Sequence, residues 1–473
     1  MRELSVPLNQ DSKVPIYHQI YEFIKKEIRE NKIEAKTMIP STRALASHLN
    51  VSRSTVQMAY DQLLSEGYIE AVACKGYFVN RIEGLYNIEV NNNKKLIKEI
   101  SKNEYDVDFS PNGIALEYFP YNAWRKVSKN VLLMEQKDLF NMGDSKGDLE
   151  FRQTIAGYLH DSRGVNCNAE NIILGAGTEY ILILLDMILD DYFGRKVSYA
   201  MENPTYPKAY SVLRTLDREV FPIGLDDYGM KTDELSISGA DVAYVTPSHQ
   251  FPLGIIMSII RRTQMLTWAN GSRERFIIED DYDSEFRYKG KPIPSLQGID
   301  KAGKVIYIGT FSKSIAPGIR MGYMVLPECL MASYDKVGGK FANTVARIDQ
   351  NIVDLFIKEG YYERHLNKMR SLYKIKHDIL LNEIKKFGKG FEVTGESAGL
   401  HILLSSERYR EDELISLAKQ KRVKVYPLSE YYIEHKTEET KKATIILGYA
   451  RLSETEIVKG IDRLVEAYCG EDM

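Results

Sequence analysis

Hydrophobic positions in the first eighty residues repeat at the spacing of short amphipathic helices. Apolar side chains recur every three or four residues over residues 16–28, which predicts a first helix. A second helix is expected over Thr42–Leu49, and Ser52 is a natural N-cap for a third helix after a short turn. Helix, short turn and helix form the arrangement that places a recognition helix in the major groove of DNA.

The pattern changes to short extended segments after the third helix. Gly67 ends that helix, and residues 68–70 and 76–79 predict a two-stranded wing with Lys75 at its tip. The outward face at the start of the third helix carries Arg53 and Thr55, which are side chains that reach base edges and phosphates. Three short helices alone would equally suit a structural bundle. At this point residues 1–80 fit either a winged helix-turn-helix DNA-binding domain or a structural bundle.

Residues 81–105 are rich in Asn, Lys and Glu and lack a sustained apolar period. We interpret them as a linker with one short helix around residues 96–100. The alternative is a surface loop of the domain that follows.

From residue 106 to residue 473, apolar strands alternate with polar loops and helical stretches. This repeat predicts an α/β domain with a mainly parallel sheet and helices on both faces. Each strand is followed at once by polar side chains, and open α/β sheets bind ligands at the carboxyl ends of their strands. The five strand-and-loop segments are residues 172–178, 197–206, 242–250, 276–282 and 305–320.

Length, charge and cysteine content narrow the class of protein. At 473 residues the chain exceeds what one hydrophobic core supports, so at least two domains are expected. The net charge of -3 means that any DNA binding must come from a local basic surface. The four cysteines are dispersed, and no apolar run approaches the ~20 residues of a membrane span. We therefore expect a cytoplasmic protein with reduced thiols, no metal site and no membrane contact.

The last strand delivers a lysine among groups that bind phosphate. Lys313 follows Thr310 and Ser312, Arg320 lies seven residues further on, and a helix starting at Gly177–Thr178 offers free backbone N–H groups. Hydroxyls and a bidentate arginine hold a phosphate, while the lysine is free to form a carbon–nitrogen double bond, an internal Schiff base. This combination suits pyridoxal 5'-phosphate (PLP) better than a nucleotide, because the spacing of a P-loop is absent.

Two further loops supply groups that would meet the pyridine ring of PLP. Tyr206 could lie flat on the ring. Asp280 would pair with the protonated ring nitrogen, and Tyr282 would hydrogen-bond the 3-oxygen of the ring. We expect Asp280 rather than Asp281 at the ring, because Asp280 shares a face of the extended strand with Tyr282.

The N-terminal motifs resemble those of a known family. PIYHQI, IPSTRALASHLNVSRSTVQMAYDQLLSEGYIE and KGYFV resemble the winged helix-turn-helix domain of the GntR family of bacterial regulators, across nearly the whole unit. The wing sequence Ala73-Cys74-Lys75-Gly76 departs from the family, which often has more glycine there. The resemblance implies that the residues contacting DNA are Arg43, Ser52, Arg53, Thr55 and Lys75.

Residues 106–468 resemble a fold-type I aminotransferase through the motifs PSHQFPLG, EDDYDSEFRY and GTFSKSIAPGIRMGY. With the GntR-like head, the whole chain is similar to the MocR/GabR family of transcriptional regulators. The resemblance implies a homodimer, commonly head-to-tail with each DNA head swapped onto the partner's larger domain. It also implies Lys313 as the PLP lysine, Asp280 and Tyr282 as ring partners, and Arg320, Thr310 and Ser312 as phosphate ligands.

Two stretches depart from working aminotransferases. Those enzymes usually carry Asn-Pro-x-Gly where this chain has Phe251-Pro252-Leu253-Gly254, so the asparagine for the 3-oxygen is missing. They also place a carboxylate-binding arginine in a strand near the C-terminus. The corresponding strand here, Ala443–Tyr449, contains no arginine, and Arg451 just after it is the candidate replacement. Loss of a bidentate clamp weakens the positioning of an amino acid for turnover, so we favour a sensor over a catalyst.

The GABA-responsive members of the family hold their ligand with two arginines, which ungapped matching places near Lys208 and Glu430. Lysine keeps a carboxylate contact, whereas glutamate repels one, and this argues against GABA as the effector. An exposed position in a charged loop is an equal interpretation of Glu430.

The leading hypothesis is a PLP-dependent regulator that binds double-stranded operator DNA. It would sense a small amino compound, or PLP itself, through Lys313 and so control genes of amino acid or vitamin B6 metabolism. One alternative is a genuine aminotransferase with an accessory DNA-binding head. Another is a plain repressor whose larger domain only dimerises.

Overall fold

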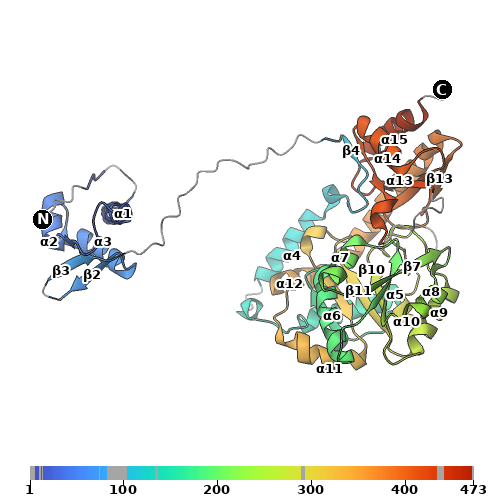
Figure 1. The fold of residues 1–473 in the computed structure, drawn as a ribbon, viewed down its shortest axis with the longest axis horizontal. Helices are drawn as coiled ribbons and strands as arrows, with labels where there is room; N and C mark the ends of the chain where they lie inside the picture. Colours follow the sequence, from blue (N-terminus) through green and yellow to red (C-terminus); the bar gives the residue numbers. More distant parts are fainter. Residues whose placement is uncertain are drawn as a thin grey trace. The chain divides into compact units, whose positions relative to one another are not determined.

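The computed structural model describes residues 6–9, 12, 14–73, 75–81, 104–133, 137–288, 293–433 and 442–470. The chain divides into two compact units, residues 1–102 and 103–473, each of which is described by itself (Figure 1). Apart from residues 81, 104 and 105, the linker predicted over residues 81–105 lies outside the described residues, as does the short helix predicted around residues 96–100.

The first unit packs three helices against a small sheet. Ser41 and Ser52 cap the second and third helices, because their Oγ atoms accept hydrogen bonds from the N–H groups of Ala44 at 3.2 Å and Thr55 at 3.1 Å. The sheet has three strands in the order β1-β3-β2, one more than the predicted wing, because Met38–Ile39 pairs with β3. The elements are α1 (Ile16–Arg29), β1 (Met38–Ile39), α2 (Thr42–Leu49), α3 (Arg53–Ser65), β2 (Ile69–Val72) and β3 (Gly76–Val79).

The second unit is built on an eight-stranded sheet in the order β5-β12-β11-β10-β9-β6-β7-β8. The five strands β11, β10, β9, β6 and β7 are parallel. β12 runs antiparallel between β5 and β11, and β8 runs antiparallel to β7. The strands are β5 (Ile172–Gly175), β6 (Tyr199–Asn203), β7 (Val220–Asp226), β8 (Gly229–Met230), β9 (Val242–Val245), β10 (Phe276–Asp281), β11 (Val305–Thr310) and β12 (Gly322–Val325).

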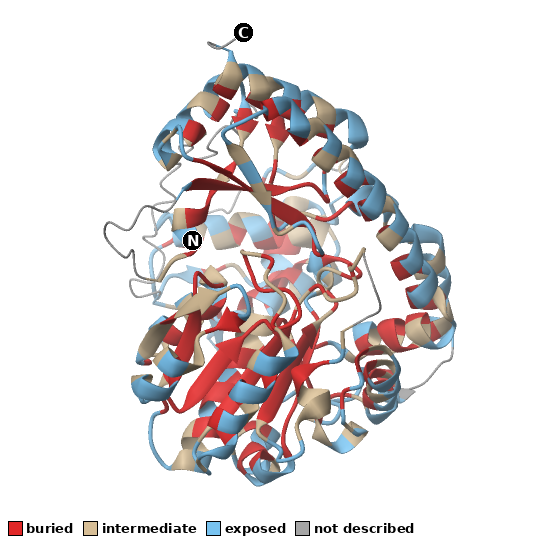
Figure 2. Ribbon diagram, turned by 90° about the vertical axis from the view of Figure 1, so that its right-hand side faces the viewer, coloured by how far each residue is buried: buried red, intermediate tan, exposed pale blue. Residues whose placement is uncertain are grey.

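Helices cover both faces of this sheet, so its central strands are buried throughout (Figure 2). Successive residues of one strand enter different cores: Ile278 packs in one hydrophobic cluster and Ile277 in another. Burial on both faces explains why these strands begin with a run of apolar residues before their carboxyl ends. The helices before residue 360 are α4 (Tyr121–Leu133), α5 (Leu149–Arg163), α6 (Thr178–Phe193), α7 (Pro207–Thr215), α8 (Thr232–Ser238), α9 (Ile259–Asn270), α10 (Leu296–Ile299), α11 (Glu328–Val337) and α12 (Arg347–Lys358).

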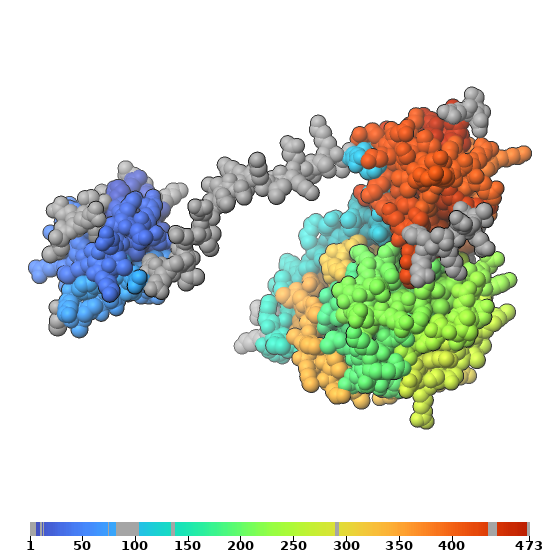
Figure 3. Space-filling view, in the orientation of Figure 1, coloured from blue at the N-terminus to red at the C-terminus, as the bar shows by residue number. Residues whose placement is uncertain are grey.

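The C-terminal residues form a smaller lobe beside the large sheet, seen in red in Figure 3. Its four-stranded sheet has the order β13-β14-β17-β16, and a separate two-stranded sheet pairs β4 with β15. The elements are β4 (Val107–Asp108), α13 (Tyr361–Ile384), β13 (Phe391–Thr394), β14 (His401–Ser406), α14 (Glu411–Gln420), β15 (Val423–Lys424), β16 (Tyr426–Pro427), β17 (Ala443–Gly448) and α15 (Glu454–Cys469).

Short 3-10 helices complete the second unit. They are η1 (Leu116–Tyr118), η2 (Lys137–Phe140), η3 (Ala169–Asn171), η4 (Pro317–Ile319), η5 (Gly338–Lys340), η6 (Lys385–Phe387) and η7 (Leu428–Tyr431). Within the described residues, none of the helices has both the length and the apolar character needed to cross a bilayer.

Candidate functional site

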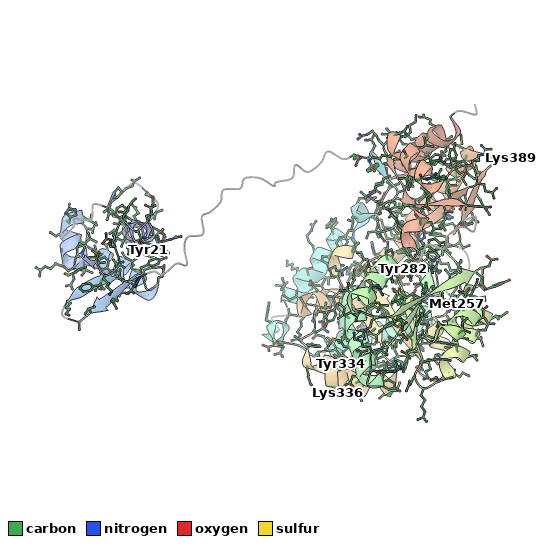
Figure 4. All side chains as sticks on the ribbon, viewed as in Figure 1. Tyr21, Met257, Tyr282, Tyr334, Lys336 and Lys389 are labelled. Carbon is green, nitrogen blue, oxygen red and sulfur yellow. The ribbon has the colours of Figure 1, made fainter. Side chains whose placement is uncertain are left out.

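Loops at the carboxyl ends of β5, β6, β9, β10 and β11 enclose one cavity of about 170 Å³. Figure 4 labels Tyr282, which lies where the lobe of the large sheet meets the C-terminal lobe. The cavity lining brings together the sequence-predicted residues Thr178, Tyr206, Lys208, Asp280, Tyr282, Thr310, Ser312, Lys313 and Arg320. It also contains Phe251, which stands where aminotransferases usually have an asparagine. Four further lining residues were not predicted for the cavity: Asn112, Glu179, Thr246 and Pro317.

Lys313 follows β11 on a loop that the core holds in place. Its neighbours Phe311 and Ile315 are buried in the largest hydrophobic cluster, so the lysine is directed away from that core into the cavity. Lys313 Nζ donates a hydrogen bond to the carbonyl oxygen of Pro111 at 3.1 Å. Burial lowers the pKa of Lys313 to about 8, against the opposing pull of the Asp283 carboxylate. The amine is therefore far more often neutral than an exposed lysine at the same pH.

One end of the cavity is suited to an anion. Gly177 precedes α6 with φ +95°, a conformation that favours glycine. A Cβ there would lie 2.5 Å from Arg320 Nη2, so a side chain would displace the guanidinium from the helix N-terminus. Arg320 itself has φ +49°, an uncommon conformation for a residue with a side chain. The hydroxyls of Thr310 and Ser312 are hydrogen-bonded to each other at 2.9 Å and line the same cavity.

A buried carboxylate also lines the cavity. Asp280 accepts a hydrogen bond at Oδ2 from the hydroxyl of Tyr244, while Oδ1 is buried without a partner. Burial raises the pKa of Asp280 to about 7, and the Tyr244 hydrogen bond opposes that rise. Asp281 points to the other face of β10, where its Oδ2 accepts hydrogen bonds from Arg163 Nε at 2.8 Å and Tyr307 at 2.6 Å. Asp281 Oδ1 is also buried without a partner, but of the two carboxylates only Asp280 lines the cavity.

Tyr282 belongs to a buried polar chain. Its hydroxyl lies 2.9 Å from His249 Nδ1, and the same nitrogen lies 3.0 Å from Asp283 Oδ2. The Phe251 ring stands edge-on to Tyr206, with centroids 5.9 Å apart, and to Tyr282, with centroids 5.8 Å apart. The position where aminotransferases usually have an asparagine is thus filled by an aromatic contact.

The three effector residues suggested by the sequence are placed differently from one another. Lys208 lines the cavity, and its Nζ lies 3.6 Å from Glu179 Oε1. Glu430 is exposed in η7 and is not part of the lining. Arg451 Nη1 pairs with Asp108 Oδ2 at 3.1 Å and does not line the cavity either. Of the three, the structure brings only Lys208 to the cavity.

These groups fit a phosphorylated aromatic aldehyde. The helix N-terminus with Arg320 and the two hydroxyls suits a phosphate, and the unpartnered Oδ1 of Asp280 suits a protonated ring nitrogen. Lys313, with its lowered pKa, lies in the same cavity and is a suitable amine for an aldehyde. The residues present therefore fit PLP.

The first unit presents a separate surface with exposed basic residues. Arg43 on α2, Arg53 at the start of α3 and Lys75 in the β2–β3 turn are all exposed. The hydroxyl oxygens of Ser52 and Thr55 lie 2.7 Å apart, and this local contact helps to fix the start of α3. Cys74, in the predicted wing tip, lies outside the described residues.

Sequence reasoning assigned no role to Tyr244 or Glu179. Tyr244 lies in the apolar run of β9, and its contact with Asp280 arises only from the pairing of β9 with β10. Glu179 could have been noticed from the sequence, because it directly follows the helix start at Thr178. At that position a neutral or basic residue suits a bound phosphate better than an acidic one.

Comparison with known proteins assigns each of the two units to a protein family. Residues 107–464 match the aminotransferase class I and II family, and residues 16–79 match the gntR family of bacterial regulatory proteins. The chain is 38% identical over 464 residues to the HTH-type transcriptional regulator YdeL of Bacillus subtilis, covering 98% of each chain. It is 30% identical to the probable rhizopine catabolism regulatory protein MocR of Rhizobium meliloti, covering 98% of this chain and 95% of that protein.

Among solved structures, the multiple substrate aminotransferase of Thermococcus profundus is similar, with a TM-score of 0.69 and 25% sequence identity. The match covers 83% of this chain and 98% of that enzyme.

Proposed function

The chain belongs to the MocR/GabR family of transcriptional regulators, in which a GntR-type head is joined to an aminotransferase-type domain, and we propose that it regulates transcription in response to PLP or a small amine. The main support for this proposal is that one cavity contains groups suited to a phosphate, a buried carboxylate with an unpartnered oxygen and a lysine of lowered pKa. An aminotransferase-type domain attached to a DNA-reading head has a direct use for such a cavity as a sensor.

Each group has a definite part in holding the cofactor. Thr178, Thr310, Ser312 and Arg320 would bind its phosphate, and Tyr206 would pack against its ring. Asp280 would bind the ring nitrogen, because ionisation of a carboxylate with a pKa of about 7 becomes favourable beside a cation.

The 3-oxygen and the aldehyde of the cofactor would meet Tyr282 and Lys313. The Tyr282 hydroxyl, held by His249, would orient the 3-oxygen. Bound PLP supplies a reversible carbon–nitrogen linkage that can exchange between Lys313 and an incoming amine.

Sensing is favoured over steady turnover by the groups around Lys313. Phe251 occupies the asparagine position and makes aromatic contacts there. Among the described residues that line the cavity, Arg320 is the only arginine, and the proposed phosphate site already uses it. Arg451 is held by Asp108 instead. An amino acid carboxylate would thus lack the bidentate clamp that positions it for repeated chemistry.

The head would read operator DNA through Arg53 at the start of α3, supported by Arg43 and Lys75. Two heads are needed to read paired half-sites, so we propose a homodimer, head-to-tail and domain-swapped as in the family, working in the cytoplasm. Rearrangement of the Lys313 linkage would change how the heads engage their operator.

The test combines absorption spectroscopy with DNA footprinting. The purified protein should develop a visible band on addition of PLP, and Lys313→Ala should lose it, whereas Lys336→Ala should keep it. Lys336 is a matched control because it is an exposed lysine of α11 paired with Asp191 and is not part of the cavity lining (Figure 4). An operator footprint that changes with PLP or an amine in the wild type, and not in Lys313→Ala, supports sensing. A footprint indifferent to both would refute it.

A genuine aminotransferase with an accessory head is the second candidate, favoured by the presence of Lys313, Asp280 and Arg320 in one cavity. It predicts steady conversion of an amino acid and a keto acid over many cycles. A single half-reaction per site would exclude it.

A further inference from the structure

An acidic side chain occupies the end of the cavity that is suited to phosphate. Glu179 lies in the first turn of α6, next to Thr178, and lines the cavity. Its Oε2 accepts a hydrogen bond from Arg320 Nη2 at 3.0 Å, and its Oε1 lies 3.6 Å from Lys208 Nζ. Three charged side chains from different segments of the chain therefore meet where the cofactor phosphate would bind.

Glu179 is charged at neutral pH. Burial opposes its ionisation, but hydrogen bonds from its own backbone N–H and from Arg320 outweigh burial, so the pKa of Glu179 is lowered. The N-terminus of a helix stabilises a carboxylate there for the same reason that it stabilises a phosphate. The protein thus carries, on its own chain, an anion that uses the same two binding features as the ligand.

Two anions cannot use Arg320 fully at once. Arg320 Nη2 already donates to Glu179 and to the carbonyl oxygen of Ala176 at 3.3 Å. A phosphate that takes the guanidinium bidentately must displace the carboxylate, or else bind next to it against charge repulsion. Lys208 offers the displaced carboxylate a second cation within reach, because it is already 3.6 Å away.

We propose that Glu179 is an affinity-determining residue that competes with the phosphate of PLP for Arg320 and keeps the cofactor exchangeable. This inference rests on the proposed function, since it requires PLP in this cavity. The unpartnered Oδ1 of Asp280, a residue only 4% exposed, is independent evidence that the cavity takes a ligand. The consequence is a binding site whose occupancy follows the supply of PLP, with Lys208 receiving Glu179 when the phosphate arrives.

The decisive variant is Glu179→Gln, which keeps the shape of the side chain and removes its charge. Absorbance titration should show PLP binding about fivefold tighter than in the wild type, because an exposed ion pair of this kind is worth up to about that factor. Pyridoxal, which lacks the phosphate, should bind the two proteins equally. Inorganic phosphate should compete with PLP more strongly in the variant.

The matched control is Asp191→Asn, which removes one negative charge from the far end of the same helix, where Asp191 pairs with Lys336. It should leave the affinity for PLP unchanged. Circular dichroism and melting temperature check folding, and Glu179→Ala, which retains helix propensity, repeats the test if the glutamine variant is unstable.

The outcomes separate the two proposals. Absence of any PLP band in the wild type would overturn the proposed function. A wild-type band with unchanged PLP affinity in both Glu179 variants would overturn the role of Glu179 and leave the proposed function standing. Equal tightening of PLP and pyridoxal would also overturn it, because the effect would then not act through the phosphate.

Discussion

The rate at which the protein captures PLP should follow the protonation of Lys313. Only the neutral amine attacks an aldehyde, and burial lowers the pKa of this amine from 10.5 to about 8. At pH 7, about one tenth of the side chains is neutral, compared with about one in three thousand for an ordinary lysine. The cavity therefore raises the reactive fraction about 300-fold, and the rate should rise with pH and level off above about pH 8.

Stopped-flow absorbance at constant PLP concentration, between pH 6 and pH 10, measures this profile. The rate of reaction of PLP with N-acetyl-lysine under the same conditions, expressed per neutral amine, serves as the reference, because dividing by it removes only the titration of PLP itself. Asp283→Asn should move the midpoint to lower pH, since the Asp283 carboxylate raises the pKa of Lys313. A midpoint near 10.5 in the wild type, or an unchanged midpoint in Asp283→Asn, would contradict this account of the cavity.

Three further substitutions test other parts of the two sites. Asp280→Asn should weaken PLP binding at least about tenfold by absorbance titration, because a neutral amide cannot balance a protonated ring nitrogen; equal affinity would remove Asp280 from the ring. Gly177→Ala should weaken PLP binding, because alanine at φ +95° costs about 1–3 kcal/mol of backbone strain and its Cβ clashes with Arg320. Gly157→Ala, in an open position within α5, is the control and should bind PLP normally and be slightly more stable. Arg53→Ala should lower operator affinity and reduce the dependence of log K on log salt by about one unit, measured by fluorescence anisotropy, while Lys26→Ala on α1 should not; identical effects of both would indicate only non-specific charge attraction.

Much of the fold followed from local patterns. The bounds of α2 and β9 were predictable from capping and apolar runs, because a serine cap and a strand buried on both faces are each determined by neighbouring residues in the sequence. β12 and β1 were not expected. Both are short and are strands only because they pair with strands distant in the chain. β12 pairs with β5 and β11, and β1 pairs with β3. Such pairing leaves no periodic signal in a stretch of two to four residues.

The cavity lining was predictable to the extent that it depends on strand ends. Asp280, in β10, and Tyr282, just after it, could be assigned to one face by simple alternation, and the structure places both in the cavity lining. The contact of Asp280 with Tyr244 depends on the register between two strands, which alternation within one strand does not specify. Glu430 was considered because ungapped matching aligned it with a family arginine, and Arg451 because it follows the strand that carries an arginine in aminotransferases. Neither argument says which way a loop turns.

The position of β12 also has a consequence for the order in which this protein matures. β12 hydrogen-bonds to β5 on one side and β11 on the other, so it joins the strand that leads into α6 to the strand that carries the lysine loop. Gly175 and Gly322 face each other across this pairing although they are far apart in the chain. During synthesis, the groups proposed to bind phosphate at the start of α6 and in the loop after β11 cannot come together until the ribosome has released β5, β11 and β12. The ability to capture PLP should therefore arise late and mark a polypeptide whose central sheet is complete.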